Sequence, residues 1–200
     1  MNNLRSAPTV LRIGVLASGE GSNLQAILDS VHGRFGVEVV CVASDKPHAR
    51  ALQRAGDAGV ASEVFALADF ASRELRDAAI AGHLRALSVD LVVLAGYMQI
   101  LSPGFIAAFH GRIINVHPSL LPKYPGLRAI EQALKAGESQ TGVTVHYVDE
   151  GVDTGPVIAQ EAIGIAPGES LESLSRRIHQ TEHRLLPEVI AQIANDAANG

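Results

Sequence analysis

Asn115 and His117 are the residues of this sequence best placed to do chemistry together. They are two positions apart on an apolar segment typical of a buried β-strand, so their side chains point to the same side. Pro118 follows directly and prevents the strand from continuing regularly. An amide beside an imidazole suits an acyl-type transfer, in which Asn holds a developing oxyanion and His donates to it or moves a proton. The pair therefore predicts the reacting edge of an enzyme.

A structural role is the alternative for each residue alone, with Asn115 bonding neighbouring backbone and His117 packing under the proline-rich turn that follows. The polar turn at residues 149–155 favours chemistry, because Asp153 in this turn could reach the imidazole. A buried Asp beside His117 would hold the ring in one orientation and favour its charged form, which can donate a proton. We therefore predict Asn115, His117 and Asp153 as the catalytic residues.

A second candidate site is the segment Ser18-Gly19-Glu20-Gly21-Ser22-Asn23, between a predicted strand and a predicted helix. Its glycines permit a tight turn and close approach of a ligand, and the first N–H groups of a helix have no partner inside it, so phosphate is the expected ligand. Ser22 and Asn23 could add donors, or either could instead cap the helix. A dinucleotide fold would place a third glycine at Leu24. Because Asp45 could still hold a ribose hydroxyl, a nicotinamide-linked oxidoreductase remains an alternative, although a mononucleotide or sugar phosphate fits better.

The elements that position these residues alternate between apolar, β-branched runs and segments with helical spacing. This alternation predicts an α/β fold with a doubly wound, mostly parallel sheet, whose ligands bind beyond the carboxyl ends of the strands. We expect the last two strands to form a different, antiparallel sheet extension. The predicted strands are residues 11–17, 37–43, 61–65, 90–95, 112–116, 142–148 and 156–165, and the predicted helices are residues 22–30, 47–58, 70–87, 127–136 and 170–197, the last bent or broken near Pro187.

Composition favours one domain over residues 1–200, because a chain of 200 residues with 47% hydrophobic content can close one substantial core. The formal net charge is -5 and the basic residues are scattered, which argues against nucleic acid and anionic lipid as partners. The single cysteine, Cys41, lies in an apolar run and is expected to be buried and inert. No segment approaches the ~20 apolar residues of a membrane span. The apolar stretch within residues 1–10 is too short for a secretory signal. We expect a cytoplasmic protein, and the sequence leaves open whether it forms a homodimer.

Four segments together resemble the folate-dependent glycinamide ribonucleotide formyltransferases of purine synthesis, and the resemblance covers almost the whole chain. The segments are Ser18 to Ile27, Leu94 to Met98, Asn115 to Gly126 and Asp153 to Ile158. The run Asn-Val-His-Pro-Ser-Leu-Leu-Pro is shared by formyl-transfer enzymes generally. The glycine loop and Lys123-Tyr124-Pro125-Gly126 are typical of the purine-pathway branch.

The resemblance implies that the amine of glycinamide ribonucleotide attacks the formyl carbon of 10-formyltetrahydrofolate, a co-substrate, without a metal ion. Asn115 and protonated His117 would stabilise the oxyanion of the tetrahedral intermediate. His117 would also transfer a proton, and Asp153 would keep the imidazole charged and oriented. The implied formyltransferase-type fold has a phosphate-binding N-terminal half and a folate-binding, catalytic C-terminal half.

The resemblance also implies which residues bind the two ligands. The substrate residues are Gly21, Ser22, Asn23, His179 and Glu182, the last two on one side of the final helix. The co-substrate residues are Arg73, Met98, Gln99, Ile100, Leu101, Asn115, Asp149, Glu150, Gly151, Val152 and Asp153. Relatives are expected to have Arg at the position of Gln99, so this chain departs from the pattern there.

Other formyl-transfer enzymes share the catalytic run and are the alternatives. Methionyl-tRNA formyltransferase would need a further RNA-binding domain, for which a chain ending at Gly200 has no room. A formyltetrahydrofolate hydrolase normally has a regulatory domain and needs no phosphate cradle. A non-catalytic folate or nucleotide binding module on the same fold is a different class of function. The intact set of Asn115, His117 and Asp153 favours the enzyme.

Overall fold

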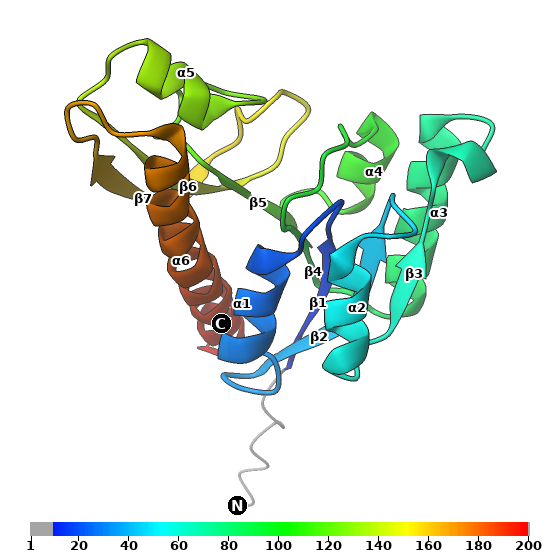
Figure 1. Ribbon diagram of the computed structural model, residues 1–200. Coiled ribbons are helices and arrows are strands. Elements are labelled where there is room, and N and C mark those ends of the chain that lie inside the picture. The colour runs from blue at the N-terminus through cyan, green and yellow to red at the C-terminus, as the bar shows by residue number, and fades with distance from the viewer. Residues whose placement is uncertain (1–9, 200) are drawn as a thin grey trace, which may run out of the picture.

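The computed structural model describes residues 10–199, which form one seven-stranded sheet in the order β3-β2-β1-β4-β5-β6-β7 (Figure 1). The strands from β3 to β5 in this order are parallel, and β6 pairs antiparallel with β5 and with β7. The predicted α/β class, the mostly parallel sheet and its antiparallel extension are confirmed. The extension continues the same sheet and is not a different one.

All predicted strands and helices are present, with ends that shift by a few residues. The strands are β1 (Leu11–Leu16), β2 (Val37–Ser44), β3 (Ser62–Val64), β4 (Leu91–Leu94), β5 (Ile113–His117), β6 (Gln140–Tyr147) and β7 (Val157–Gly164). The helices are α1 (Ser22–Ser30), α2 (Arg50–Asp57), α3 (Arg73–Ala86), α4 (Pro103–Ala108), α5 (Ala129–Lys135) and α6 (Leu171–Asn199), with one 3₁₀ turn, η1 (Leu67–Asp69).

Helices cover both faces of the sheet, which explains why the central strands are mostly apolar. Alternate residues of β1 face opposite sides, so that Ile13 packs with α1, α2 and α6 while Leu16 packs with α3 and α4. In β4, Val93 and Val92 divide in the same way. The two clusters make a three-layer arrangement that fixes the central strands from both sides (Figure 1).

Two helices differ from the sequence prediction. α6 continues through Pro187 and is not broken there. Proline has no N–H to donate to the preceding turn, but Leu186 and Ile190 on either side are completely buried, so packing outweighs the lost bond. The sequence prediction omits α4, which has only six residues. Ser102 caps it by accepting from Phe105 N, because a side-chain oxygen can satisfy one of the free donors of a first turn.

The carboxyl ends of β1, β4 and β5 lie next to one another in the sheet. The loops that follow these three strands therefore meet at one edge, where parallel sheets bind their ligands. Cys41 is buried, as predicted, and burial raises the pKa of its thiol to about 11. No helix within residues 10–199 combines the length and apolar character that crossing a membrane requires.

Candidate active site

Asp153 joins the two polar side chains at the end of β5. Asn115 Nδ2 donates to Asp153 Oδ1 at 3.3 Å, and His117 Nδ1 lies 3.2 Å from Asp153 Oδ2. His117 is 4% exposed, so the cluster is largely shielded from water. The structure thus brings together the three residues predicted to be catalytic, across 38 positions of the chain between Asn115 and Asp153.

The environment of Asp153 keeps its carboxyl ionised. Burial raises the pKa of Asp153, but hydrogen bonds from His146 and from Gly126 N, together with the adjacent imidazoles, lower it from 3.8 to about 2. The bond from Gly126 N is 2.8 Å long and reaches the same oxygen that faces His117. A fixed negative charge at this place is well suited to orient and stabilise an imidazolium.

Both ring nitrogens of His117 face acceptors. Nδ1 faces the Asp153 carboxylate, and Nε2 lies 2.8 Å from the carbonyl oxygen of Tyr124. Neither a carboxylate nor a carbonyl oxygen can donate, so only an imidazolium satisfies both contacts, whereas a neutral ring donates to one. The geometry therefore suits a charged His117 that carries a transferable proton on Nε2.

His146 belongs to the same cluster, and sequence reasoning missed it. It lies on β6 directly opposite Asn115 in the antiparallel pair. Its Nδ1 is 2.8 Å from Tyr147 O, and because a carbonyl can only accept, this nitrogen carries a hydrogen. Its Nε2 lies 3.2 Å from Asn115 Nδ2 and 3.5 Å from Asp153 Oδ1. His146 therefore lies against both Asn115 and Asp153, and the only signal in the sequence is a histidine within a predicted apolar strand.

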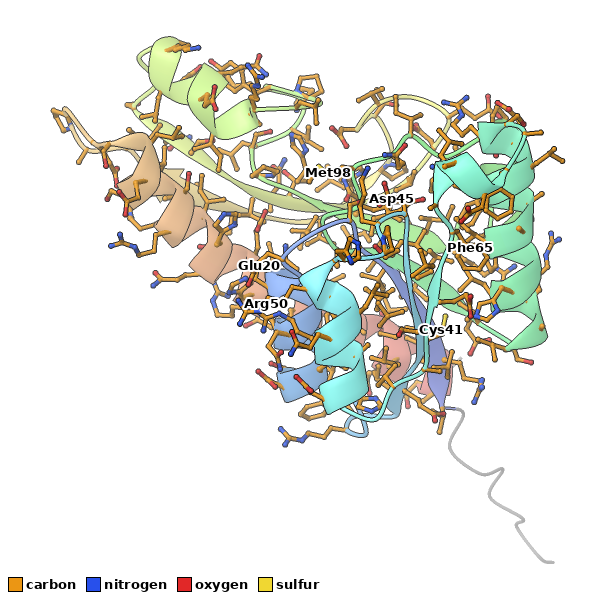
Figure 2. The ribbon with its side chains drawn as sticks, turned by 45° about the vertical axis from the view of Figure 1, so that its right-hand side comes forward. Glu20, Cys41, Asp45, Arg50, Phe65 and Met98 are labelled. Atoms are coloured by element: carbon orange, nitrogen blue, oxygen red, sulfur yellow. The ribbon has the colours of Figure 1, made fainter. Side chains whose placement is uncertain are left out.

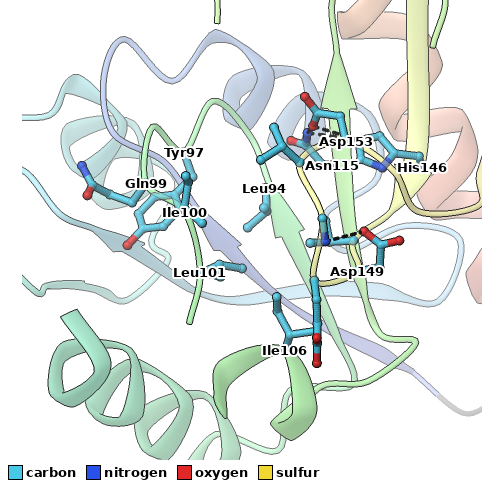
Figure 3. Close-up of a pocket in the computed structure, with 14 residues that line it drawn as sticks. Leu94, Tyr97, Gln99, Ile100, Leu101, Ile106, Asn115, His146, Asp149 and Asp153 are labelled. Atoms are coloured by element: carbon cyan, nitrogen blue, oxygen red, sulfur yellow. Dashed lines mark hydrogen bonds and ion pairs between the residues drawn. The ribbon is translucent and has the colours of Figure 1, made fainter. Parts of the chain in front are cut away.

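A first pocket of about 120 Å³ opens beside this cluster. Figure 3 shows Asn115, His146 and Asp153 gathered at one end of it, with Leu94, Leu101 and Ile106 along its apolar wall. The predicted co-substrate residues that line it are Gln99, Ile100, Leu101, Asn115, Asp149, Glu150, Gly151, Val152 and Asp153. An apolar slot with a few polar groups at one end is the usual form of a site for a flat organic ligand.

The turn at one side of this pocket is ordered by its own side chains. Asp149 Oδ1 accepts from Gly151 N at 3.0 Å and from Thr154 Oγ1 at 2.6 Å. Across the pocket mouth, Ile100 is 65% exposed and Val152 is 51% exposed. Exposed apolar side chains on either side of an opening are available to cover an apolar ligand.

Two predicted co-substrate residues do not line the first pocket. Met98 lines the second pocket, described below, and lies on the exposed side of its loop. Arg73 begins α3, where Nη2 lies 3.5 Å from Glu74 Oε1, and it lines neither pocket. The proposed folate contact of Arg73 therefore draws no support from its position.

A second pocket of about 300 Å³ lies over the glycine loop. Gly21 has φ 72°, and a Cβ there would lie 2.7 Å from Ala51 Cα, so only glycine fits. Gly21 precedes α1, and no side chain caps that helix. The capping roles considered for Ser22 and Asn23 are therefore wrong, and the first N–H groups of α1 face the pocket without a side-chain acceptor.

Charged groups flank this loop on its outer side. Figure 2 shows Glu20 beside Arg50, and their side chains form an ion pair of 2.8 Å. Arg54 also pairs with Glu20, at 2.9 Å. Ser18 Oγ accepts from Met98 N at 2.8 Å and joins the glycine loop to the loop after β4. These contacts join the glycine loop to α2 on one side and to the loop after β4 on the other.

Glu182, His179 and Asn23 form a polar group at the far side of the second pocket. Glu182 is 4% exposed, and its Oε2 accepts from Asn23 Nδ2 at 3.2 Å and lies 2.9 Å from His179 Nδ1. The hydrogen bond to Glu182 raises the pKa of His179 and outweighs the effect of burial. Asn23 Oδ1 is buried and has no partner among the described residues. The structure thus brings together all five predicted substrate residues around one pocket.

Asp45, the residue considered for a nicotinamide dinucleotide, is 5% exposed and accepts from Gln99 Nε2 at 2.9 Å. It lines neither of the two pockets. Its Oδ2 is therefore occupied by Gln99, its Oδ1 is buried without a hydrogen-bond partner among the described residues, and neither oxygen is presented to a ribose on the glycine loop. Among residues 10–199, no group of three or more His, Cys, Asp and Glu side chains has an arrangement that could hold a metal ion.

The fold, the shielded cluster at the end of β5 and the two adjoining pockets are those of a transferase of small acyl groups, and the chain belongs to the formyl transferase family. The family model for formyl transferases matches residues 11–190. Phosphoribosylglycinamide formyltransferase of Haemophilus influenzae is 44% identical over 180 residues, which cover 90% of this chain and 85% of that protein. The resemblance inferred from the four sequence segments is confirmed.

Similarity extends to solved structures and to a larger protein. Glycinamide ribonucleotide transformylase 1 from Symbiobacterium toebii is 47% identical with a TM-score of 0.93, covering 98% of this chain and 92% of that chain. The trifunctional purine biosynthetic protein adenosine-3 of Drosophila melanogaster is 50% identical over 190 residues. The match covers 94% of this chain but only 14% of that protein, so the chain corresponds to a small part of it.

Proposed function

We propose that this chain transfers the formyl group of 10-formyltetrahydrofolate to the amine of glycinamide ribonucleotide, giving formylglycinamide ribonucleotide in purine synthesis. The observation that carries the proposal is the position of β5 between two different pockets. Asn115 lines the apolar pocket, while Val116 and Pro118 line the pocket over the glycine loop. A formyl donor in the first and an amine in the second would meet at the Asn115, His117 and Asp153 cluster. The names of the similar proteins support the same reaction.

In this reaction the amine nitrogen bonds to the formyl carbon, negative charge develops on the formyl oxygen, and the bond from that carbon to the folate nitrogen then breaks. One proton leaves the amine and one reaches the departing nitrogen. Asn115 stabilises the oxygen by donating from its amide, the kind of contact that typically contributes ~10²- to 10³-fold to kcat. Asn115 lines the pocket, and its Nδ2 faces Asp153 and His146, so one of these two contacts is exchanged for the formyl oxygen in catalysis.

His117 supplies the second donor and moves the proton. Its Nε2 faces Tyr124 O and His117 lines neither pocket, so in catalysis it exchanges this carbonyl for the formyl oxygen. Asp153 holds the opposite nitrogen and keeps the imidazolium in place throughout. Catalytic hydrogen bonds commonly rearrange when the substrate binds, so the contact with Tyr124 is compatible with this role.

The glycine-loop pocket suits the phosphorylated substrate. The uncapped N–H groups at the start of α1 and the helix dipole favour a phosphate there. The buried carboxylate of Glu182 can only accept, which fits ribose hydroxyl groups as donors. When protonated, His179 places a cation beside that carboxylate, so that the pocket does not present an unpaired negative charge to the phosphate.

The wider predictions belong to the same proposal. The glycine loop of the N-terminal half and the catalytic and folate-binding segments of the C-terminal half work as one domain. The partners are the two small molecules, with no nucleic acid or membrane, and the protein acts in the cytoplasm. No metal ion takes part, and the proposal leaves open whether the protein forms a homodimer.

The decisive experiment combines purified protein, 10-formyltetrahydrofolate and glycinamide ribonucleotide and follows release of tetrahydrofolate. We expect release that requires the amine substrate. Release that proceeds equally without the amine would identify a hydrolase. Binding of a nicotinamide dinucleotide in a titration that shows no folate binding would instead revive the oxidoreductase.

A further inference from the structure

A buried ion pair lies behind the wall of the first pocket, in a place that the proposed chemistry does not use. Arg76 and Asp77 are consecutive residues of α3, and both side chains are completely buried. Arg76 Nη2 and Nε donate to Asp77 Oδ1 at 2.7 and 3.0 Å. Charged side chains are almost never fully buried unless they are paired, and a buried pair still needs further hydrogen bonds to replace its hydration. The partners that supply those bonds reveal what the pair holds in place.

Both members of the ion pair reach the loop that forms one wall of the pocket. Asp77 Oδ2 accepts from Ser102 N at 2.6 Å, and Arg76 Nη1 donates to Gln99 Oε1 at 3.3 Å. Between these two contacts lie Ile100 and Leu101, which line the pocket together with Gln99. The ion pair therefore fixes this stretch of wall at both of its ends.

Gln99 links the ion pair to a second buried carboxylate. Its Nε2 donates to Asp45 Oδ2 at 2.9 Å, while its Oε1 accepts from Arg76. A carboxamide is matched to this place because it accepts on one side and donates on the other. A carboxylate at position 99 would face Asp45, and a cation would face Arg76. The side chain that lines the pocket is thus determined by charges that lie behind it.

The cluster contains one buried cation for two buried carboxylates. Lys46 Nζ lies 3.9 Å from Asp45 Oδ2, but it is on the surface and largely exposed. Burial raises the pKa of the neighbouring Tyr97, so its phenol stays neutral among these charges. Figure 3 shows Tyr97 and Gln99 on the same side of the pocket, away from Asn115. The guanidinium of Arg76 is therefore the main charge that keeps this wall together.

We propose that Arg76 and Gln99 are positioning residues for the formyl donor, which hold residues 97–101 as a preformed wall of its pocket. This inference rests on the proposed function, because that function assigns the pocket to the formyl donor. Arg76 acts without touching the ligand, and Gln99 acts by joining Arg76 to Asp45. Neither Arg76 nor Gln99 lines the glycine-loop pocket, and of residues 97–101 only Met98 does, so the larger effect falls on the folate side of the reaction.

The first test replaces Gln99 by methionine, which has a similar length but makes neither hydrogen bond. We expect the KM for 10-formyltetrahydrofolate to rise about tenfold, the size expected when hydrogen bonds to charged groups are lost. The kcat and the KM for glycinamide ribonucleotide should stay within about twofold of wild type. Gln192→Met is the matched control, because Gln192 donates to Asp196 at 2.7 Å on the exposed surface of α6. This control should leave all three constants unchanged.

The second test exchanges the two side chains, so that the cation lies at position 99 in the pocket wall and the carboxamide at position 76 on α3. Arg76→Gln alone leaves Asp77 unpaired, and Gln99→Arg alone places two cations together, so each should raise the KM for the formyl donor more than tenfold or yield little folded protein. The double variant restores one cation and one carboxamide between the same two carboxylates. It should recover a KM within about threefold of wild type. A merely space-filling role would not produce this rescue.

An unchanged KM for the formyl donor in Gln99→Met would overturn the inference, as would a double variant no better than its worse single parent. An inactive wild-type protein would instead refute the proposed function. In that case, titration of tetrahydrofolate into wild type and Gln99→Met still decides the positioning role. Equal affinities would reject it, and weaker binding to the variant would support it.

Discussion

Replacing Asp153 by asparagine tests whether a charge, rather than only a hydrogen-bond acceptor, organises the cluster. The folded protein lowers the pKa of this carboxyl from 3.8 to about 2. At about 1.4 kcal/mol per pKa unit, the charged form is favoured on folding by about 2.5 kcal/mol. Because the side chain is only 13% exposed, solvent screens little of this energy. Asp153→Asn should therefore lower the free energy of unfolding by about 2 kcal/mol at pH 7.

The sign of the pH dependence follows from the lowered pKa. The stabilisation by Asp153 is fully present above the ordinary pKa of 3.8 and is lost as the pH falls through about 2. About half of it should remain at pH 3. Urea unfolding of wild type and variant at pH 7, 4 and 3 measures this difference directly, since titration of all other groups is common to both proteins. The two stabilities should converge as the pH decreases.

The same substitution should reduce kcat by about 10²- to 10⁴-fold, the usual contribution of a positioned proton donor, with little change in either KM. The neutral amide no longer favours a charged His117, and the NH2 group that replaces one carboxylate oxygen cannot accept from Asn115 Nδ2 as Asp153 Oδ1 does. A variant with near wild-type turnover would refute the charge argument. So would a loss of stability that stays constant between pH 7 and pH 3.

Three further predictions concern the glycine-loop pocket. Gly21→Ala should lower the free energy of unfolding by well over ~1 kcal/mol, and by more than Gly33→Ala, because both sites have φ near 70° but only the first lacks room for a Cβ. Glu182→Gln should raise the KM for glycinamide ribonucleotide about tenfold, while Glu188→Gln, on the exposed side of α6, leaves it unchanged. In wild type the KM for glycinamide ribonucleotide should rise as the pH passes above the raised pKa of His179, since the cation is present only below that pKa. In His179→Gln this rise should be absent. A rise that persists in the variant would show that the charge of His179 does not affect substrate binding.

The fold could be predicted because its central strands are buried on both faces and its helices on one. β4 is an unbroken apolar run, and β1 and β5 are apolar apart from Arg12, Asn115 and His117; the two layers of helices that cover these strands explain why. The six residues of α4 are too few for a hydrophobic period, although Ser102 and Pro103 form a start signal that could have been used. The pairing of β6 with β5 could not be predicted, because strand partners are chosen by contacts distant in sequence.

The site was predictable where a local period determines side-chain direction. Asn115 and His117 share a side because they are two apart on a strand, and the glycine loop could be identified from residues in sequence. His146 was missed because its importance comes only from lying opposite Asn115 in β6. Arg76 looks like an exposed helical arginine until α3 is packed against the loop after β4. Partners separated by 20 to 40 positions are set by topology, which a single sequence does not display.

Two residues of the site have an unfavourable backbone conformation that is also set by contacts distant in sequence. Asp153 and Tyr124 have φ of 55° and 54°, in the left-handed region where a residue with a side chain costs roughly 1–2 kcal/mol. Local preference alone would place glycine at both positions. Each instead directs one acceptor at His117, the Asp153 carboxylate at Nδ1 and the Tyr124 carbonyl at Nε2. Glycine at 153 would relieve the strain but remove the charge. Phe35, Ser88 and Arg128 share this conformation away from the site, so it is the two acceptors directed at one imidazole, and not the backbone conformation alone, that mark His117 as the centre of the site.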